Sequence, residues 1–168
     1  MPIGPSADLP DLPVGEAIPA LRTALTNRGR AILVAPPGAG KTTVVPLALL
    51  AEAWLGDQRI VMLEPRRLAT RAAAHRMAST TRTAVGDLVG YQTRDERRIG
   101  AGTRIEVVTE GVLPRRRQND PELPGVGAVI FDEVHDRNLT TDLGLALTLD
   151  VASTLRPDLR MFYFSGYH

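Results

Sequence analysis

One stretch decides the fold: Ala31-Ile32-Leu33-Val34-Ala35-Pro36-Pro37-Gly38-Ala39-Gly40-Lys41-Thr42-Thr43. It begins with an apolar run typical of a buried strand and ends in a glycine-rich turn followed by Lys-Thr. Lys41 is the only lysine of the chain, since every other residue counted under Lys+Arg is an arginine. A compact ammonium reaches between phosphates, whereas a planar guanidinium does not fit the same cradle. The stretch therefore predicts a phosphate-binding loop that holds a nucleoside triphosphate.

Each part of this loop has an expected role. Gly38 and Gly40 let the backbone fold around the phosphates and direct N–H groups toward them. Lys41 is expected to contact the β- and γ-phosphates, and the Thr42 hydroxyl to bind Mg²⁺. Thr43 stands where a dinucleotide-binding fingerprint has its third glycine, which disfavours that alternative. The residues expected to bind the nucleotide are Pro37, Gly38, Ala39, Gly40, Lys41, Thr42 and Thr43.

A second apolar run delivers acidic residues to the same site. Val129-Ile130-Phe131 reads as a strand and is followed by Asp132 and Glu133, with His135 two residues further on. We expect Asp132 to hold Mg²⁺, partly through water, and Glu133 to polarise the attacking water. His135 could sense the γ-phosphate, and Lys41, Glu133 and His135 are the expected catalytic residues. Without the loop, this Asp-Glu pair could equally be a surface helix cap and His135 a structural side chain.

The remaining apolar runs alternate with amphipathic ones. Short unbroken strands between helices indicate an α/β fold with a mostly parallel sheet covered on both faces. Residues 1–14 are expected to form an extended lead-in and residues 15–168 one domain. Helices are predicted over residues 15–28, 41–55, 67–79 and 140–155. Strands are predicted over residues 31–35, 59–63, 88–92, 104–109, 128–131 and 160–164, with a charged turn over 94–102.

The composition excludes several classes of function. The net charge is +1, so any attraction to nucleic acid depends on local clusters of arginine. There is no cysteine, which excludes disulfides, thiolate metal sites and a thiol nucleophile. No apolar stretch is long enough for a membrane span, and the N-terminus does not resemble a signal peptide. We expect a cytoplasmic protein without a membrane partner.

Several segments resemble, in the correct order, the motifs of bacterial HrpB-type ATP-dependent helicases of the DEAH/RHA group in superfamily 2. Motif I is matched by Ala35 to Thr42, and motif II by Asp132-Glu133-Val134-His135. The other matches are Leu63 to Ala69 (motif Ia), Gly90 to Arg94 (a Gly-Tyr-x-x-Arg strand), Thr109-Glu110-Gly111 (motif Ib) and Asp120 to Val126 (the segment before motif II). The resemblance covers nearly the whole chain, from about Pro13 to Phe164.

The resemblance implies the first RecA-like motor domain of a helicase, a P-loop three-layer sandwich that uses ATP and Mg²⁺. It implies that ATP hydrolysis drives movement along, or unwinding of, an RNA or DNA strand in the full-length protein. Binding is expected to single-stranded nucleic acid and independent of sequence, because no base-reading element is visible. The residues expected to contact the strand are Pro65, Arg66, Arg67, Arg94, Thr109 and Gly111. Taken alone, Arg66 and Arg67 could be a solvated helix start, and Arg115-Arg116-Arg117 reads as a solvated face.

Three features depart from the family pattern. Motif III reads Ser-Ala-Thr in the family, whereas this chain has Ser165-Gly166-Tyr167, of which only Ser165 matches; the resemblance implies that Ser165 couples the ATP state to nucleic-acid binding. The domain is expected to be truncated at this motif, and the second RecA-like domain with its arginine fingers to be missing from the chain. The loss of such a finger costs about 10³- to 10⁵-fold in rate, so the fragment should hydrolyse ATP very slowly. Pro114 would break the helix expected after Glu110 unless it occupies the first turn.

Two other functions stay open from the sequence. One is a truncated, non-catalytic module that binds nucleotide or nucleic acid. The other is a small-molecule P-loop kinase, which is disfavoured because no insertion suited to an acceptor-binding lid is visible.

Overall fold

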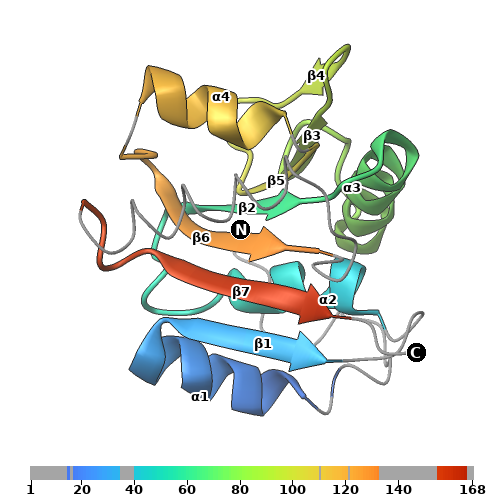
Figure 1. Cartoon of the computed structure of the whole chain (residues 1–168). Coiled ribbons are helices and arrows are strands. Elements are labelled where there is room, and N and C mark those ends of the chain that lie inside the picture. The colour runs from blue at the N-terminus through green and yellow to red at the C-terminus, as the bar shows by residue number, and fades with distance from the viewer. Residues whose placement is uncertain are drawn as a thin grey trace.

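A parallel sheet forms the centre of the molecule. The computed structural model describes residues 15, 17–34, 40–109, 111–120, 122–132 and 155–165, with the backbone alone at residues 41, 114, 117, 118 and 165. Within these ranges, seven strands form one sheet in the order β1-β7-β6-β2-β5-β3-β4 (Figure 1). Every neighbouring pair is parallel except β3 and β4, which run antiparallel. The expected mostly parallel sheet is confirmed.

The strands arise from the apolar runs of the sequence. β2 and β6 lie at the middle of the sheet, and every residue of β5 and β6 is buried. Such strands have no solvated face, so they lack the alternation of polar and apolar residues that marks a half-exposed strand. Their bounds are β1 (Arg30–Val34), β2 (Arg59–Leu63), β3 (Val89–Gln92), β4 (Arg97–Arg98), β5 (Ile105–Val108), β6 (Val126–Phe131) and β7 (Arg160–Ser165).

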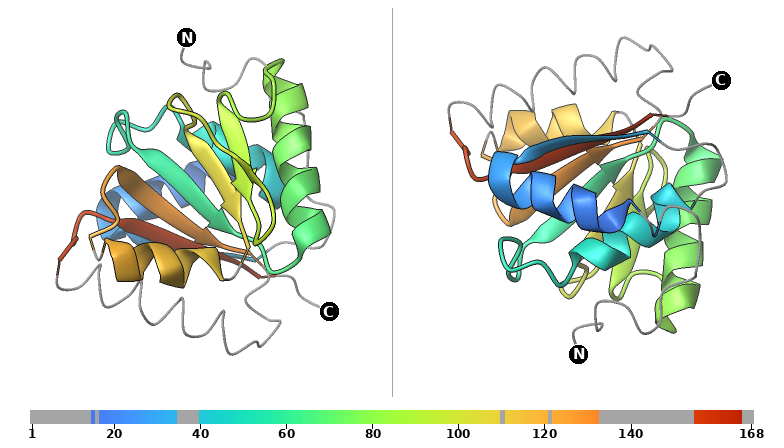
Figure 2. Two further views of the ribbon diagram at one scale, coloured as in Figure 1. Left: turned by 90° about the horizontal axis from the view of Figure 1, so that it is seen from above. Right: turned by 90° about the horizontal axis from the view of Figure 1, so that it is seen from below.

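Helices cover both faces of this sheet. The described helices are α1 (Ile18–Arg28), α2 (Lys41–Leu49), α3 (Arg67–Thr81) and α4 (Val112–Asn119). α1, α2 and α3 contribute side chains to one apolar core, whereas α4 packs with a second core on the opposite face. Figure 2 shows α1 and α2 in front of the strands when the molecule is seen from below. The expected three-layer arrangement is therefore present.

The helix that follows the phosphate loop is shorter than predicted. The sequence predicts it over residues 41–55, but α2 ends at Leu49. Pro46 lies inside α2 and cannot donate a backbone hydrogen bond to Thr42 four residues earlier. After α2 the chain continues in successive four-residue turns, in which the N–H groups of Glu52, Leu55 and Gln58 each donate to the carbonyl three residues before. These turns bury Leu55 and lead directly into β2.

The charged turn predicted over residues 94–102 contains a strand. β4 consists of Arg97 and Arg98, both exposed, and pairs with Tyr91 and Gln92 of β3. Its side chains carry no apolar pattern, so the pairing depends on the neighbouring strand. Gly90 allows the close approach, because a Cβ atom there would lie 2.2 Å from the Arg98 carbonyl oxygen.

Two further predictions concern helix ends. Pro114 is the third residue of α4, where the backbone N–H has no acceptor inside the helix, so the proline is tolerated as the sequence allowed. Of the helix predicted over residues 140–155, residues 140–154 lie outside the described part, and Leu155 forms a turn. The lead-in over residues 1–14 also lies outside it. Among the described helices, none combines the length and apolar character needed to cross a membrane.

Candidate nucleotide and nucleic-acid site

All parallel strands end at one edge of the sheet, and this edge gathers the predicted site residues. Thr42 follows β1 through the loop, and Asp132 directly follows β6. Pro65 and Arg67 follow β2, and Thr109 follows β5. The carboxyl edge of a parallel sheet is where ligands bind in α/β proteins, so the topology builds one site from segments far apart in the sequence.

The loop enters α2 through a left-handed glycine. Gly40 has φ +90°, a conformation that costs any residue with a Cβ atom, and its carbonyl accepts hydrogen bonds from the N–H groups of Thr43 (3.2 Å) and Val44 (2.8 Å). Residues 35–39, which include Pro37, Gly38 and Ala39, lie outside the described part. Lys41 is the first residue of α2, and its side chain lies outside the described part as well.

The predicted magnesium ligands face each other. The Thr42 hydroxyl donates a hydrogen bond to the Asp132 carboxylate, with 3.3 Å between Oγ1 and Oδ2, although 90 residues separate them in the sequence. Asp132 is 4% exposed, and its backbone N–H extends the β6–β2 pairing by donating to the Leu63 carbonyl at 3.0 Å. A hydroxyl and a carboxylate oxygen are hard ligands of the kind Mg²⁺ prefers, so the pair fits a magnesium site. Glu133 and His135 lie outside the described part.

Three of the helices in the described part of the chain begin at this edge. α2, α3 and α4 start after Gly40, Arg66 and Gly111, and no side chain of these capping residues bonds the helix start. Unsatisfied N–H groups and the helix dipole give each start a partial positive charge. The edge is therefore electrically suited to anionic groups such as phosphates.

A cleft at the same edge collects four of the six predicted nucleic-acid contacts. Pro65, Arg67, Arg94 and Thr109 line it together with Asp95, and its volume is about 550 Å³. Of the other two predicted residues, Arg66 is the exposed N-cap of α3 and Gly111 is the exposed N-cap of α4. Ser165 pairs with Val34, the last residue of β1 before the phosphate loop.

A buried threonine supports the cleft, and the sequence analysis missed it. Thr70 is 0% exposed, and its hydroxyl donates to the Arg66 carbonyl at 2.8 Å. The same hydroxyl lies 3.5 Å from the carbonyl oxygen of Glu64, the residue that follows β2, so Thr70 links the start of α3 to the segment that carries Pro65 and Arg67. Thr70 sits inside an ordinary helical pattern, so no sequence signal distinguished it.

Acidic residues of the β3–β4 turn pair with the start of α3, which the sequence analysis also missed. Asp95 forms an ion pair with Arg67, and Glu96 one with Arg71 at 3.5 Å. Glu96 also accepts a hydrogen bond from the buried Tyr91 hydroxyl at 2.7 Å. That bond is the main reason why the pKa of Glu96 lies below its ordinary value and the pKa of Tyr91 above its own. The spacing of Arg67 and Arg71, one helical turn apart, was the available signal.

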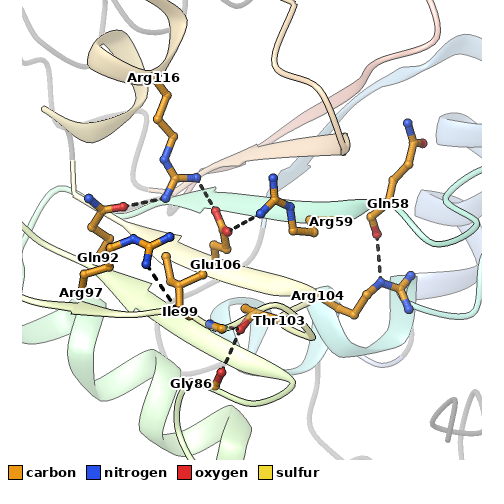
Figure 3. Close-up of polar contacts among 11 residues, drawn as sticks. Gln58, Arg59, Gly86, Gln92, Arg97, Ile99, Thr103, Arg104, Glu106 and Arg116 are labelled. Carbon is orange, nitrogen blue, oxygen red and sulfur yellow. Dashed lines mark hydrogen bonds and ion pairs between the residues drawn. The ribbon is translucent and has the colours of Figure 1, made fainter. Parts of the chain in front are cut away.

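A buried carboxylate anchors α4 to the sheet (Figure 3). Glu106, in the middle of β5, is 1% exposed and forms ion pairs with Arg59 at 3.0 Å and with Arg116 of α4. Arg116 also donates to the Gln92 side chain at 2.7 Å. Arg116 belongs to the basic run that the sequence suggested was a solvated face, but the structure gives it these two partners beneath α4.

Known proteins share this arrangement. The family model of the DEAD/DEAH box helicase matches residues 16–164. The chain is similar to the ATP-dependent RNA helicase HrpB of Escherichia coli (strain K12), with 51% identity over 155 residues that cover 92% of this chain and 19% of that protein. The ATP-dependent RNA helicase DHX33 of Mus musculus is 38% identical over 133 residues, covering 79% and 19%.

The three-dimensional likeness is equally close. The crystal structure of the Escherichia coli DEAH/RHA helicase HrpB matches with a TM-score of 0.90 and 50% identity, covering 94% of this chain and 20% of that chain. The expected RecA-like fold and the expected resemblance to HrpB-type helicases are thereby confirmed. The chain spans about a fifth of the length of the two curated relatives named above. Because the family model matches most of the chain, the chain belongs to the DEAD/DEAH box helicase family.

Proposed function

We propose that the chain is the ATP-binding half of the motor of an ATP-dependent RNA helicase. The observation that carries this proposal is the contact between Thr42 and Asp132, which joins the start of the phosphate-loop helix to the end of the acidic strand. A glycine-rich turn alone occurs in many proteins. A hydroxyl at the helix start and a buried carboxylate facing it are the two protein groups that hold a nucleotide-bound magnesium ion in P-loop enzymes, where phosphate oxygens and waters complete its octahedral shell.

In this proposal, the loop residues Pro37 to Thr43 hold the phosphates, and the Lys41 ammonium neutralises the β- and γ-phosphates. Thr42 and Asp132 hold Mg²⁺, Asp132 partly through water. When bound, Mg²⁺ neutralises the charge that develops on the phosphates. Glu133, next to Asp132 in the sequence, orients the attacking water, and His135 responds to the γ-phosphate.

The second half of the proposal concerns the strand. The cleft between Pro65, Arg67, Arg94 and Thr109 presents two guanidinium groups and a hydroxyl beside the uncapped start of α3. Such groups suit phosphate oxygens and carry no base-reading pattern, so binding to single-stranded RNA is expected to be independent of sequence and sensitive to salt. Arg66 and Gly111, next to the cleft residues in the sequence, offer further backbone contacts to the nucleic acid. Ser165 couples the nucleic-acid site to the phosphate loop through its pairing with Val34.

The complete reaction is proposed for a longer protein. The curated relatives named above are about five times as long as the matched region, so the second RecA-like domain with its arginine fingers is expected in the remainder. Without such fingers the rate falls by about 10³- to 10⁵-fold, and this chain alone should turn over ATP very slowly. ATP and RNA as the substrates favour a cytoplasmic protein.

A titration with a fluorescent ATP analogue tests the nucleotide site. Lys41→Ala should abolish binding with or without Mg²⁺, because it removes the charge that neutralises the phosphates. Arg28→Ala removes an exposed cation at the other end of β1 and serves as the matched control with unchanged affinity.

The magnesium ligands are tested in the same titration. Asp132→Asn should weaken binding by about 10- to 100-fold when Mg²⁺ is present and leave it unchanged in a chelator. Unchanged affinity of Lys41→Ala would refute the nucleotide site. Equal effects of Asp132→Asn with and without Mg²⁺ would refute the assignment of Asp132 as a metal ligand.

A further inference from the structure

One acidic side chain lies inside the cleft proposed for the nucleic-acid strand. Asp95 lines that cleft with Pro65, Arg67, Arg94 and Thr109. Its carboxylate forms an ion pair with Arg67, the first residue of α3, through Oδ2 and Nη1. A carboxylate and a phosphodiester present similar oxygens to a guanidinium. Asp95 is therefore bound to the same Arg67 guanidinium that a phosphate of the strand would bind.

The turn that carries Asp95 is held in a fixed shape. The Thr93 hydroxyl accepts hydrogen bonds from the N–H groups of Asp95 (3.3 Å) and Glu96 (3.1 Å), and the Thr93 N–H donates to the Glu96 carbonyl (2.9 Å). Thr93 is 6% exposed, so these bonds are partly buried. Tyr91, also buried, holds the Glu96 side chain from beneath at 2.7 Å. The turn thus presents Asp95 to α3 in one geometry.

A second ion pair sets the position of the turn along α3. Glu96 contacts Arg71 at 3.5 Å, one helical turn beyond Arg67. Two acidic residues in succession therefore match two arginines spaced four apart, which is the spacing of neighbours on one helix face.

Arg67 and Asp95 line two cavities. Both residues line the cleft of about 550 Å³ and a second cavity of about 340 Å³, whose other walls are Leu68, Arg71, Thr93 and Glu96. Both side chains of the ion pair are about two-thirds exposed, at 64% and 63%, so a ligand in solution can reach the pair and displace it.

We propose that Asp95 is an internal competitor for the phosphate backbone of a bound nucleic-acid strand. It neutralises Arg67 in the free protein, and a phosphodiester must displace it before Arg67 can bind. The inference rests on the proposed nucleic-acid binding of this cleft. Its consequence is that Asp95 lowers the affinity for single-stranded nucleic acid and reduces the dependence of that affinity on salt.

The size of the effect follows from the exposure of the pair. An exposed ion pair contributes little in water, so removing the carboxylate should tighten binding by about two- to fivefold near physiological salt. The salt dependence should change as well. In the wild type, Arg67 exchanges the Asp95 carboxylate for a phosphate. Without Asp95, Arg67 is a free cation that neutralises one more phosphate charge when the strand binds, and counterions are released. The slope of log affinity against log salt should become steeper by up to about 0.7.

Fluorescence anisotropy with a labelled oligouridylate of roughly ten nucleotides measures both quantities. Asp95→Asn keeps the shape of the side chain and should bind more tightly, with a steeper salt slope. Asp57→Asn is the matched control. It removes the same charge from an exposed residue before the other end of β2, and should leave the slope unchanged.

A second background shows whether Asp95 acts through Arg67. In Arg67→Ala, the further substitution Asp95→Asn should produce little gain, because the competing contact is already gone. An equal gain in both backgrounds would mean general repulsion of phosphates and would overturn the proposal.

The outcomes also separate this inference from the proposed function. Suppose that the wild type binds the oligonucleotide and that Arg67→Ala weakens binding, but Asp95→Asn binds no more tightly than the wild type. Competition by Asp95 is then refuted, while nucleic-acid binding by the cleft is supported. If neither the wild type nor Asp95→Asn binds at low salt, the cleft is not a nucleic-acid site, and the inference falls with it.

Discussion

Three carboxylates near the carboxyl edge of the sheet have different surroundings, and these surroundings separate their roles. Asp132 is 4% exposed and faces the Thr42 hydroxyl, as a metal ligand would. Asp95 is exposed and paired with Arg67, so an anion from solution can take its place on the guanidinium. Glu96 is bonded to the buried Tyr91 hydroxyl, and this contact orders the turn. The same chemical group is thus a candidate metal ligand at Asp132, the proposed competitor at Asp95 and a support of the β3–β4 turn at Glu96.

The contact between Tyr91 and Glu96 predicts a measurable titration. The bond from the Tyr91 hydroxyl lowers the pKa of Glu96, with smaller contributions from Arg71 and Arg98. A carboxyl whose pKa is lower in the folded state stabilises the fold above its ordinary pKa, and this contribution disappears as pH falls through the lowered pKa. Tyr91→Phe should therefore raise the pKa of Glu96 toward its ordinary value, as measured by carbon NMR of the carboxyl group.

The matched control for this titration is Tyr163→Phe. Tyr163 is half-buried, and burial raises the pKa of its own phenol, but it lies on β7 and not beside the turn. That variant should leave the titration of Glu96 unchanged. An unshifted Glu96 pKa in Tyr91→Phe would show that the arginines, and not the hydrogen bond, hold it down.

At the scale of elements, α4 is attached to the sheet by charge as well as by apolar contact. Val112 and Leu113 in its first turn are buried, and Arg116 in its middle reaches Glu106 of β5. Because α4 begins directly after the Thr109–Gly111 segment, whatever fixes α4 also fixes that segment.

Glu106→Gln tests this attachment. The change leaves Arg59 and Arg116 without their shared carboxylate, which is 1% exposed. Removing one partner of a fully buried ion pair costs about 3–5 kcal/mol, but both arginines are partly solvated, so we expect a loss of about 2 kcal/mol in the free energy of unfolding. Urea denaturation gives this value. Amide hydrogen exchange should accelerate in α4 more than in β2.

Glu122→Gln is the control for this loss, because Glu122 is exposed and its backbone carbonyl, rather than its side chain, accepts the bond from Arg156. It should change the free energy of unfolding by less than about 0.5 kcal/mol. If exchange in α4 is unaffected by Glu106→Gln, the apolar contacts alone hold the helix.

At the scale of the whole molecule, the sequence predicts the elements that have a regular apolar pattern. It misses the elements and side-chain contacts that depend on a partner far away in the sequence. The strand over residues 59–63 is predicted at its observed bounds because residues 60–63 form a continuous apolar run directly after Arg59. The meeting of Thr42 and Asp132 is predicted because parallel strands end at a common edge. β4 is missed because Arg97 and Arg98 have no apolar signal and are placed by pairing with β3. Asp95 and Glu106 are missed because a charged residue looks the same in sequence whether it is solvated or paired.

The order of the strands yields the last prediction. β7 comes last in the described chain but lies between β1 and β6, and in the sheet order it is the one neighbour of β1. Met161, Phe162 and Phe164 on β7 are each 0% exposed. At about 2 kcal/mol for each buried side chain, their loss removes about 6 kcal/mol, comparable with the whole stability of about 5–15 kcal/mol of a typical domain.

Deleting residues 160–168 should therefore abolish the cooperative unfolding transition measured by circular dichroism. It should also abolish binding of the fluorescent ATP analogue, because β1 leads into the phosphate loop. Deleting residues 166–168 alone leaves β7 intact and should preserve both. A cooperative transition with retained nucleotide binding in the longer deletion would mean that β1 finds its place without β7. The loop would then owe its position to the packing of α1 and α2 rather than to the sheet.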